Sequence, residues 1–177
     1  MSPERVLRDY FPAKDENRPH QLHGVFAHDA CLEIRNRSEE IHFPSATRGI
    51  DAIADVLVRR FNQTYENIYS FYMARPSADD TEFSCDWLVG MTEKESKRVR
   101  VGCGRYEWTF RGDDTRVATC LVITIDQMLL LPAEAATEVR TWLLSLSYPW
   151  ASVVAATAAP FPAILEPVAA FLGRETN

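Results

Sequence analysis

Two acidic residues and one basic residue lie in strand-like segments where they could do acid–base chemistry. Arg105 and Glu107 are two residues apart, so in a strand their side chains share one face. An arginine beside a carboxylate lowers the pKa of that carboxylate and holds it ionised, as a water-activating base requires. Asp86 stands between Cys85 and Trp87, and is either a pocket acid or the polar side of a half-buried strand. Glu107, Arg105 and Asp86 are therefore the candidate catalytic residues.

Aromatic residues alternate with these charges and allow the opposite arrangement. If Arg105 and Glu107 face a pocket, Tyr106 and Trp108 face outward and need a cover, such as a second subunit or the C-terminal segment. If the aromatic residues face inward, the pocket is apolar and the two charges lie on the surface. Because a shift of one residue exchanges the two faces, the sequence leaves both arrangements open. The aromatic candidates for ligand binding are Tyr10, Trp87, Tyr106 and Trp108.

The histidines do not make a convincing metal site. His20 and His23 have the i, i+3 spacing that can share a helical face, and His28 with Asp29 follows soon after. No cysteine or glutamate completes the set at short range, so we expect no bound metal. The sequence also lacks a phosphate-binding loop, a dinucleotide-binding glycine pattern and a nucleophile elbow, so we expect no cofactor.

The elements that position these residues follow from apolar periodicity. Apolar residues spaced along 6–11 predict a short helix, which Pro12 ends. Alternation predicts a strand over 30–35, and a stripe of apolar residues three and four apart predicts a helix over 50–61.

Long strands follow in close succession. Residues 67–74, 82–92, 98–111 and 116–128 have strand-like patterns, with a charged loop and a Gly112-Asp-Asp turn between the last three. Tight connections between sequential strands are typical of an antiparallel meander. The order therefore predicts an α+β fold, with a curved antiparallel sheet wrapped around N-terminal helices.

The chain becomes helical again after Pro132. Val139, Trp142 and Leu146 have helical spacing, and residues 151–172 are rich in alanine and proline. This segment is too apolar for a solvated tail. We therefore predict a domain over residues 1–131 and a helical C-terminal extension over 132–177, which packs on the sheet or on a partner subunit.

Composition limits the classes of partner. The 177 residues carry a formal net charge of −6, which argues against a general nucleic-acid-binding protein and against a polybasic membrane anchor. The apolar runs are too short to span a bilayer, and the first residues lack a signal-peptide core. We therefore expect a cytoplasmic protein. Its four cysteines form no CxxC pair, and in such a compartment we expect them to be reduced and mostly buried.

Two stretches resemble the nuclear transport factor two-like superfamily, also called SnoaL-like or ketosteroid-isomerase-like. One is Phe26-Ala-His-Asp-Ala-Cys-Leu-Glu33, followed after a loop by Gly49-Ile-Asp-Ala-Ile53. The other is Gly104-Arg-Tyr-Glu-Trp-Thr-Phe-Arg111, followed by an acidic turn and a last strand. The resemblance covers roughly residues 3–130. It implies a cystatin-like cone, in which a highly curved sheet wraps the helices and leaves a pocket at the open end.

The resemblance also allows the functional positions of the superfamily to be compared with the residues of this sequence. The isomerases of this superfamily place a carboxylate base where this sequence has Ile34, so the familiar isomerase mechanism is not expected. Their oxyanion site implies roles for Tyr10 and Glu107, and the pocket histidine of related dehydratases suggests His28. Limonene-type epoxide hydrolases carry Arg-x-Asp along one strand, as in Arg105-x-Glu107, but their remaining aspartate falls here at Val122.

Two functions stay open on these grounds. The first is a pocket protein that binds a small hydrophobic, cyclic molecule, either without catalysis or as a cofactor-free dehydratase, isomerase, cyclase or hydrolase. The second is a non-catalytic, oligomer-forming subunit, comparable to the β subunits of ring-hydroxylating dioxygenases. We expect a homodimer in either case, because the long sheet has apolar residues on both faces.

Overall fold

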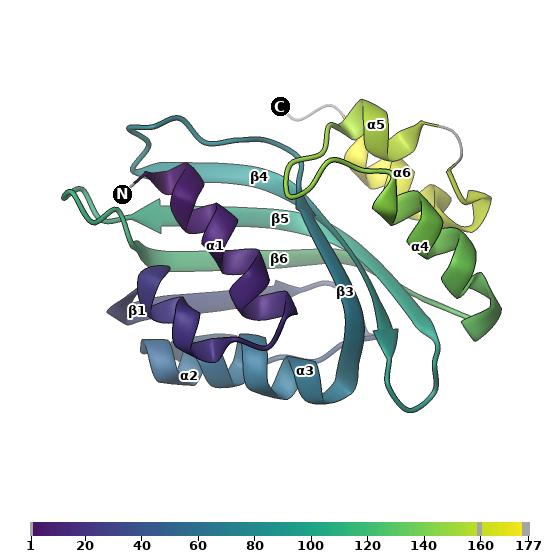
Figure 1. Cartoon of the computed structure of the whole chain (residues 1–177), viewed down its shortest axis with the longest axis horizontal. Coiled ribbons are helices and arrows are strands. Elements are labelled where there is room, and N and C mark those ends of the chain that lie inside the picture. The colour runs from purple at the N-terminus through teal and green to yellow at the C-terminus, as the bar shows by residue number, and fades with distance from the viewer. Residues whose placement is uncertain (1, 159–160, 175–177) are drawn as a thin grey trace.

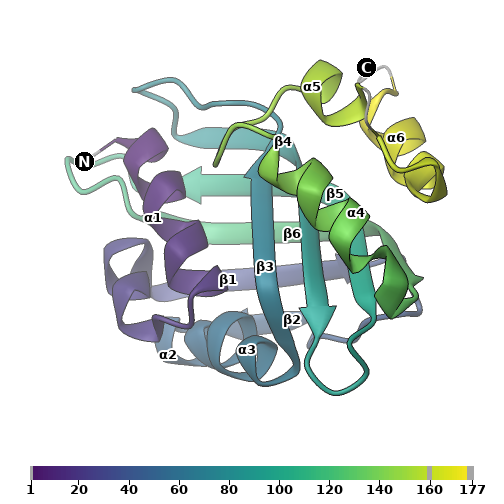
Figure 2. The ribbon, with the colours of Figure 1, turned by 45° about the vertical axis from the view of Figure 1, so that its right-hand side comes forward.

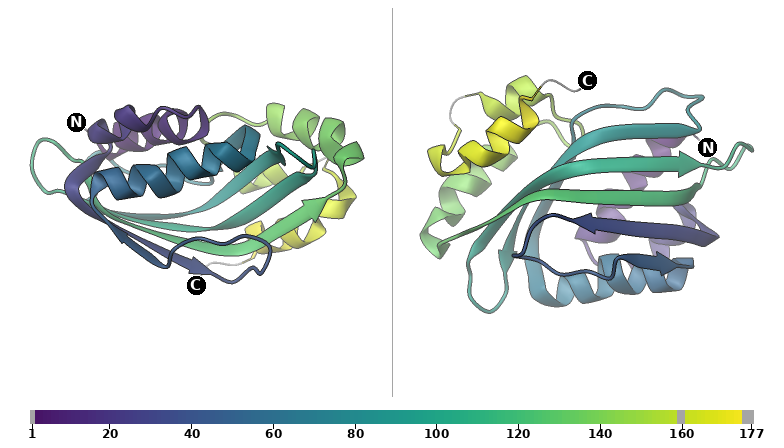
Figure 3. Two further views of the ribbon diagram at one scale, coloured as in Figure 1. Left: turned by 90° about the horizontal axis from the view of Figure 1, so that it is seen from below. Right: turned by 180° about the vertical axis from the view of Figure 1, so that it is seen from behind.

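The computed structural model describes residues 2–158 and 161–174, and its centre is one strongly curved sheet (Figures 1 and 3). Six strands form this sheet in the order β2-β1-β6-β5-β4-β3. The strands are β1 (Phe26–Asn36), β2 (Ala46–Arg48), β3 (Tyr65–Tyr72), β4 (Glu82–Glu93), β5 (Val99–Phe110) and β6 (Ala118–Leu131). This is the predicted α+β architecture, and every long strand lies where the sequence placed it.

The sheet is mixed, whereas the sequence predicted an antiparallel one. Strands β3 to β6 form the expected antiparallel meander, and β2 pairs antiparallel with β1. Strand β1, however, runs parallel to β6. The whole helical and meander segment lies between β1 and β6 in sequence, and a long crossover of this kind permits parallel pairing.

The first helix, α1 (Pro3–Asp15), is longer than predicted (Figure 2). Ser2 caps its first turn by accepting a hydrogen bond from the backbone N–H of Arg5. The prediction that Pro12 ends this helix is wrong, because α1 continues through it for a further turn. Burial of Ala13 and Lys14 against the sheet and the second helix holds this last turn in place despite the missing backbone donor.

The second helix begins after Gly49, whose φ of 89° favours glycine. It consists of α2 (Ile50–Ala54), a π-helical stretch η2 (Asp55–Arg60) and α3 (Phe61–Thr64). With α1 and the short 3₁₀ helix η1 (Pro19–Gly24), it covers the concave face of the sheet (Figure 3). The predicted apolar stripe is confirmed, since Ile50, Ile53 and Leu57 are buried there.

The C-terminal helices cover part of the opposite, convex face (Figure 2). They are η3 (Ala133–Ala135), α4 (Ala136–Leu144), α5 (Val153–Thr157), η4 (Ala163–Leu165) and α6 (Glu166–Leu172). Val139, Trp142 and Val168 pack there with Leu88 and Val101 of the sheet in a second apolar core. The extension thus packs on its own sheet, and the apolar convex face of β3–β5 has a cover within the chain. Residues 159–160 and 175–177 of the predicted extension lie outside the described residues.

The cysteines differ from the expectation of four reduced thiols. Cys31 of β1 and Cys120 of β6 are directly paired in register and form a disulfide. Their Cα atoms are 4.6 Å apart, within the range that a disulfide bridges. The sequence could not show this proximity, because 89 residues separate the two positions. Cys85 and Cys103 are free and buried, as predicted.

Among the described residues, no helix has both the length and the apolarity needed to span a bilayer.

Alkylation should distinguish these two classes of cysteine. Burial raises the pKa of both Cys85 and Cys103 to about 12, so neither thiol should react in the folded protein at pH 8.5. We expect no labelling of the native protein, two labelled thiols after denaturation, and four after denaturation with reduction. Mass spectrometry counts the labels, and four labels without a reductant would contradict the disulfide.

Close packing at Gly104 generates a stability prediction. A Cβ atom at this position would lie 1.9 Å from the backbone oxygen of Thr124 and 2.9 Å from the Trp87 ring. Gly104→Ala should therefore destabilise the protein by about 3 kcal/mol or more, the upper end of the cost of overpacking. Gly112→Ala is the matched control, because nothing lies within 4 Å of a Cβ there. Urea denaturation of both variants tests this, and equal midpoints would refute it.

Candidate functional site

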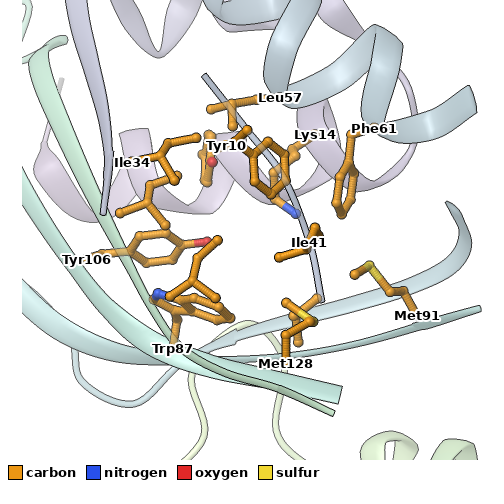
Figure 4. Close-up of a pocket in the computed structure, with 14 residues that line it drawn as sticks. Tyr10, Lys14, Ile34, Ile41, Leu57, Phe61, Trp87, Met91, Tyr106 and Met128 are labelled. Carbon is orange, nitrogen blue, oxygen red and sulfur yellow. The ribbon is translucent and has the colours of Figure 1, made fainter. Parts of the chain in front are cut away.

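A small apolar cavity lies inside the cone, between the concave face of the sheet and helices α1 and α2–α3 (Figure 4). Its volume is about 60 Å³. Four of its lining residues carry polar atoms, namely Tyr10, Lys14, Trp87 and Tyr106. The remaining lining residues are aliphatic, methionine or phenylalanine side chains. The cavity therefore presents a few polar groups on an otherwise apolar wall, as small-molecule sites commonly do.

Strand alternation brings the wall residues together. Trp87, Val89 and Met91 are two apart on β4 and point to the same, concave side. On β6 the spacing changes, since the lining residues Ile125 and Met128 are three apart. The β5–β6 register shifts between Cys103 and Gly104, and this irregularity restores Met128 to the concave face.

The two tyrosines of the cavity are neutral hydrogen-bonding groups. Tyr10 and Tyr106 pack edge to face, with ring centroids 6.3 Å apart. Burial raises the pKa of Tyr10 far above its ordinary value, the Asp15 charge adds to the rise, and the Tyr106 hydroxyl partly offsets it. Burial likewise raises the pKa of Tyr106 well above its ordinary value. Both phenols therefore keep their protons at any physiological pH.

Two of the polar atoms are buried without a hydrogen-bond partner. They are the Tyr10 hydroxyl and the indole Nε1 of Trp87, neither of which finds an acceptor among the described residues. A buried donor without an acceptor costs about 1–3 kcal/mol, so native proteins seldom leave one without a reason. Asp15 Oδ2, Arg100 Nη1 and the indole Nε1 of Trp108 and Trp150 are also buried without a partner, but these residues do not line the cavity. Tyr10 and Trp87 are therefore the unpaired donors that an acceptor atom inside the cavity could meet.

A buried lysine completes the polar set. Lys14 is only 6% exposed, and its ammonium Nζ pairs with the carboxylate of Asp15 and donates a hydrogen bond of 3.2 Å to Ser70 Oγ. The same Nζ lies 5.0 Å from the centre of the Phe61 ring, within cation–π range. The ammonium charge is thus compensated but remains at the cavity wall (Figure 4).

Sequence reasoning missed Lys14 because it ended the first helix at Pro12. Lys14 follows Tyr10 by four residues, and this spacing places both side chains on one helical face once the helix continues. The signal was present in the sequence, but it depended on the length of α1. Ile34 also lines the cavity, so the position where the isomerases would carry their base is here an apolar wall residue.

Of the predicted ligand-binding residues, the structure brings three to the cavity. Tyr10, Trp87 and Tyr106 line it directly. Trp108 is buried beside them, with its ring centroid 5.1 Å from that of Tyr10, but it does not line the cavity. His28 is exposed on β1 and lies outside the lining as well.

The predicted catalytic residues lie on the convex face of the sheet. The aromatic residues of β5 face inward, which is the second of the two arrangements that the sequence left open. Arg105 contacts Asp86 at 3.4 Å, and Arg174 contacts the same carboxylate at 3.0 Å. Glu107 instead pairs with Arg35 at 3.2 Å. Arg105 and Glu107 remain partly exposed, and none of the three predicted residues lines the cavity.

The interaction between Lys14 and Asp15 should contribute measurably to the free energy of unfolding. Both side chains are more than nine-tenths buried, so Lys14→Met leaves a carboxylate in an apolar site without its counter-charge. Removing one partner of such a pair typically costs about 3–5 kcal/mol. We expect a loss of this size for Lys14→Met and a markedly smaller loss for the double variant Lys14→Met/Asp15→Asn, measured by urea unfolding. Additive losses would show that the charges do not interact.

Comparison with known proteins agrees on the fold. No protein-family model and no curated protein sequence matches the chain. Solved structures do match it. An NTF2-like protein from Burkholderia xenovorans is 19% identical, with a TM-score of 0.52 over 71% of this chain and 92% of that one.

Two further structures extend this likeness. A protein with a ketosteroid isomerase-like fold from Catenulispora acidiphila, solved in complex with trimethylamine, is 15% identical, with a TM-score of 0.53 over 70% of this chain and 85% of the other. A hexachlorocyclohexane dehydrochlorinase is 16% identical, with a TM-score of 0.57 over 71% and 84% of the two chains. At these identities the likeness shows a common fold and carries no activity across. The curved sheet, the helices in its concave face and these neighbours together show that this chain has the fold of the nuclear transport factor two-like, or SnoaL-like, superfamily.

Proposed function

We propose that this protein binds a small, apolar, cyclic molecule that carries a hydrogen-bond-accepting oxygen. The observation that carries the proposal is the chemistry of the polar cavity groups. The Lys14 ammonium and the Trp87 indole can only donate, and the Tyr10 and Tyr106 phenols keep the protons that they can donate. A carbonyl, ether or phenolic oxygen would satisfy the Tyr10 and Trp87 donors, which have no acceptor among the described residues.

The apolar wall selects the rest of the ligand. Ile34, Leu57, Ile123 and Ile125 surround the polar groups with aliphatic surface. Each buried CH₂ or ring carbon of a ligand gains transfer free energy there, at about 25 cal/mol per Å² of apolar area. Trp87 and Tyr106, whose rings stack at a centroid distance of 5.6 Å, add a flat surface suited to another ring.

The same lining supports binding rather than acid–base catalysis. None of the described residues that line the cavity carries a carboxylate or an imidazole, the groups that most often transfer protons in active sites. The carboxylate of Asp15 is adjacent but is engaged by Lys14. The fold itself hosts many activities, so the lining residues decide between them.

The proposed binding requires movement of the cavity wall, because the cavity is small. About 60 Å³ is less than half of the roughly 150 Å³ that holds a benzene in an engineered protein cavity. Ile41, Phe43, Met91 and Met128 also line it. Methionine side chains adapt their shape readily, so Met91 and Met128 are suited to move aside for a ring.

Titration with two matched compounds tests the proposal. Naphthalene supplies an aromatic ring system alone, and 2-acetylnaphthalene supplies the same rings with one carbonyl. We expect the ketone to bind the purified protein with 1:1 stoichiometry and about tenfold more tightly than the hydrocarbon, because one net hydrogen bond is worth about 1 kcal/mol or somewhat more. Isothermal titration calorimetry measures both affinities, and quenching of tryptophan fluorescence reports on Trp87.

Variants assign the binding to the cavity. Tyr106→Phe removes one donor and should weaken binding of 2-acetylnaphthalene about fivefold, the equivalent of about 1 kcal/mol. Tyr69→Phe makes the same chemical change on the convex face of β3 and should leave the affinity unchanged. Binding of neither compound, or equal losses in both variants, would refute the proposal.

A further inference from the structure

Arg100 is a buried charge paired with a residue of the cavity wall, although Arg100 itself is not among the residues that line the cavity. It lies on β5 directly opposite Met91 of β4, and paired residues of antiparallel strands point to the same face. Met91 lines the cavity, so the Arg100 side chain leaves the sheet on the concave side, next to the cavity wall. The residue is only 8% exposed. A guanidinium buried to this degree requires partners for its donors.

Not every hydrogen-bond donor of the Arg100 guanidinium has an acceptor. Its Nε donates to Glu93 Oε1 at 2.8 Å. Its Nη1 is buried and has no hydrogen-bond partner among the described residues. Nη1 lies 3.8 Å from Glu40 Oε2, and this distance is too long for a hydrogen bond. The Arg100 Nη1 is therefore a charged donor that lacks an acceptor at bonding distance.

Glu40 belongs to a loop that separates the cavity from an outer groove. In this loop, Ile41 and Phe43 line both the cavity and the groove. The groove has a volume of about 300 Å³, and Glu40 and Tyr65 lie on its wall. Tyr65 is also a partner of Arg100, whose charge and hydrogen bond to the Tyr65 hydroxyl partly offset the burial that raises the pKa of that hydroxyl. The loop thus closes the cavity on the side where Arg100 lies.

We propose that Arg100 binds the carboxylate of the ligand, so that the ligand class is an apolar, ring-containing monocarboxylate. This inference rests on the proposed function and adds the charge of the ligand to it. The rings occupy the cavity, and the carboxylate accepts a hydrogen bond from Nη1 at the mouth. Glu40 stands near that position in the closed protein and moves away with its loop when the ligand binds.

The charges around the mouth favour a single negative charge. Glu93 keeps its bond to Nε, and its carboxylate would repel a dianion such as a phosphate monoester. Lys14 is not the carboxylate site, because it already has both Asp15 and Ser70 as partners. Arg60 and His42 also line the outer groove, and the Arg60 guanidinium pairs there with the carboxylate of Asp55 at 2.8 Å.

A pair of matched ligands separates this inference from the proposed function. The ligands are 2-naphthoate and 2-naphthamide, which share their rings and differ in charge. We expect the purified protein to bind the carboxylate about tenfold more tightly than the amide, since charge-assisted hydrogen bonds are about twice as strong as neutral ones. The amide should still bind, because the cavity accepts its rings. Calorimetry at fixed pH and ionic strength measures both affinities.

Two variants with matched controls locate the carboxylate. Arg100→Gln should reduce the preference for naphthoate to less than twofold, while Arg98→Gln removes the same charge from an exposed position two residues away and should preserve it. Glu40→Gln removes the competing carboxylate and should tighten naphthoate binding severalfold. Glu39→Gln, at an exposed neighbouring position, should leave it unchanged. Glu40 is exposed, so this variant remains informative even if Arg100→Gln fails to fold.

The outcomes are distinct. Equal affinity for naphthoate and naphthamide in the unmodified protein would overturn the role of Arg100 and leave the apolar pocket intact. A preference for naphthoate that Arg100→Gln preserves, or that Glu40→Gln does not increase, would overturn it as well. Binding of neither compound would overturn the proposed function, and the further inference with it.

Discussion

The aromatic side chains of β5 point inward, and the placement of the neighbouring charges and helices follows from this orientation. Tyr106, Trp108 and Phe110 are buried on the concave face, against α1 and β1. Strand alternation then sends Arg105 and Glu107 to the convex face, where they form ion pairs near the surface. This register buries three large rings and leaves the two charges near solvent. The opposite register would expose the rings and bury the charges, and both changes are unfavourable.

Both faces of the sheet are used, but by different parts of the chain. The N-terminal helices fill the concave face and leave the small cavity, while α4 and α6 cover an apolar part of the convex face. Gly90 shows how closely the outer layer packs, since a Cβ there would lie 2.2 Å from Leu143 Cδ1 of α4. The C-terminal extension therefore belongs to the packed structure, although Leu144, Val154 and Ile164 remain exposed on its surface.

The cavity combines a well-packed wall with incompletely satisfied polar atoms. Most buried donors in proteins have acceptors, yet among the described residues Tyr10, Trp87, Arg100, Trp108 and Trp150 each contribute a buried donor atom without one. Tyr10 and Trp87 line the cavity, and Ile41 and Phe43 separate it from the outer groove. Unpaired donors in a cavity wall are physically reasonable where a ligand supplies the missing acceptors, because the cost of the unpaired donors is then recovered on binding.

Apolar periodicity of 2 or 3.6 residues reports directly on strands and helices, so the local elements and the fold class follow from the sequence alone. The sequence also placed Tyr10, Trp87 and Tyr106 among the candidates for ligand binding, and these three residues line the apolar cavity. The face of β5 that points inward follows only from the folded chain, since alternation is the same in either register. Lys14 and the Cys31–Cys120 disulfide likewise depended on contacts between distant segments, namely the packing that carries α1 past Pro12 and the parallel pairing of β1 with β6. Such contacts leave no periodic trace in the sequence.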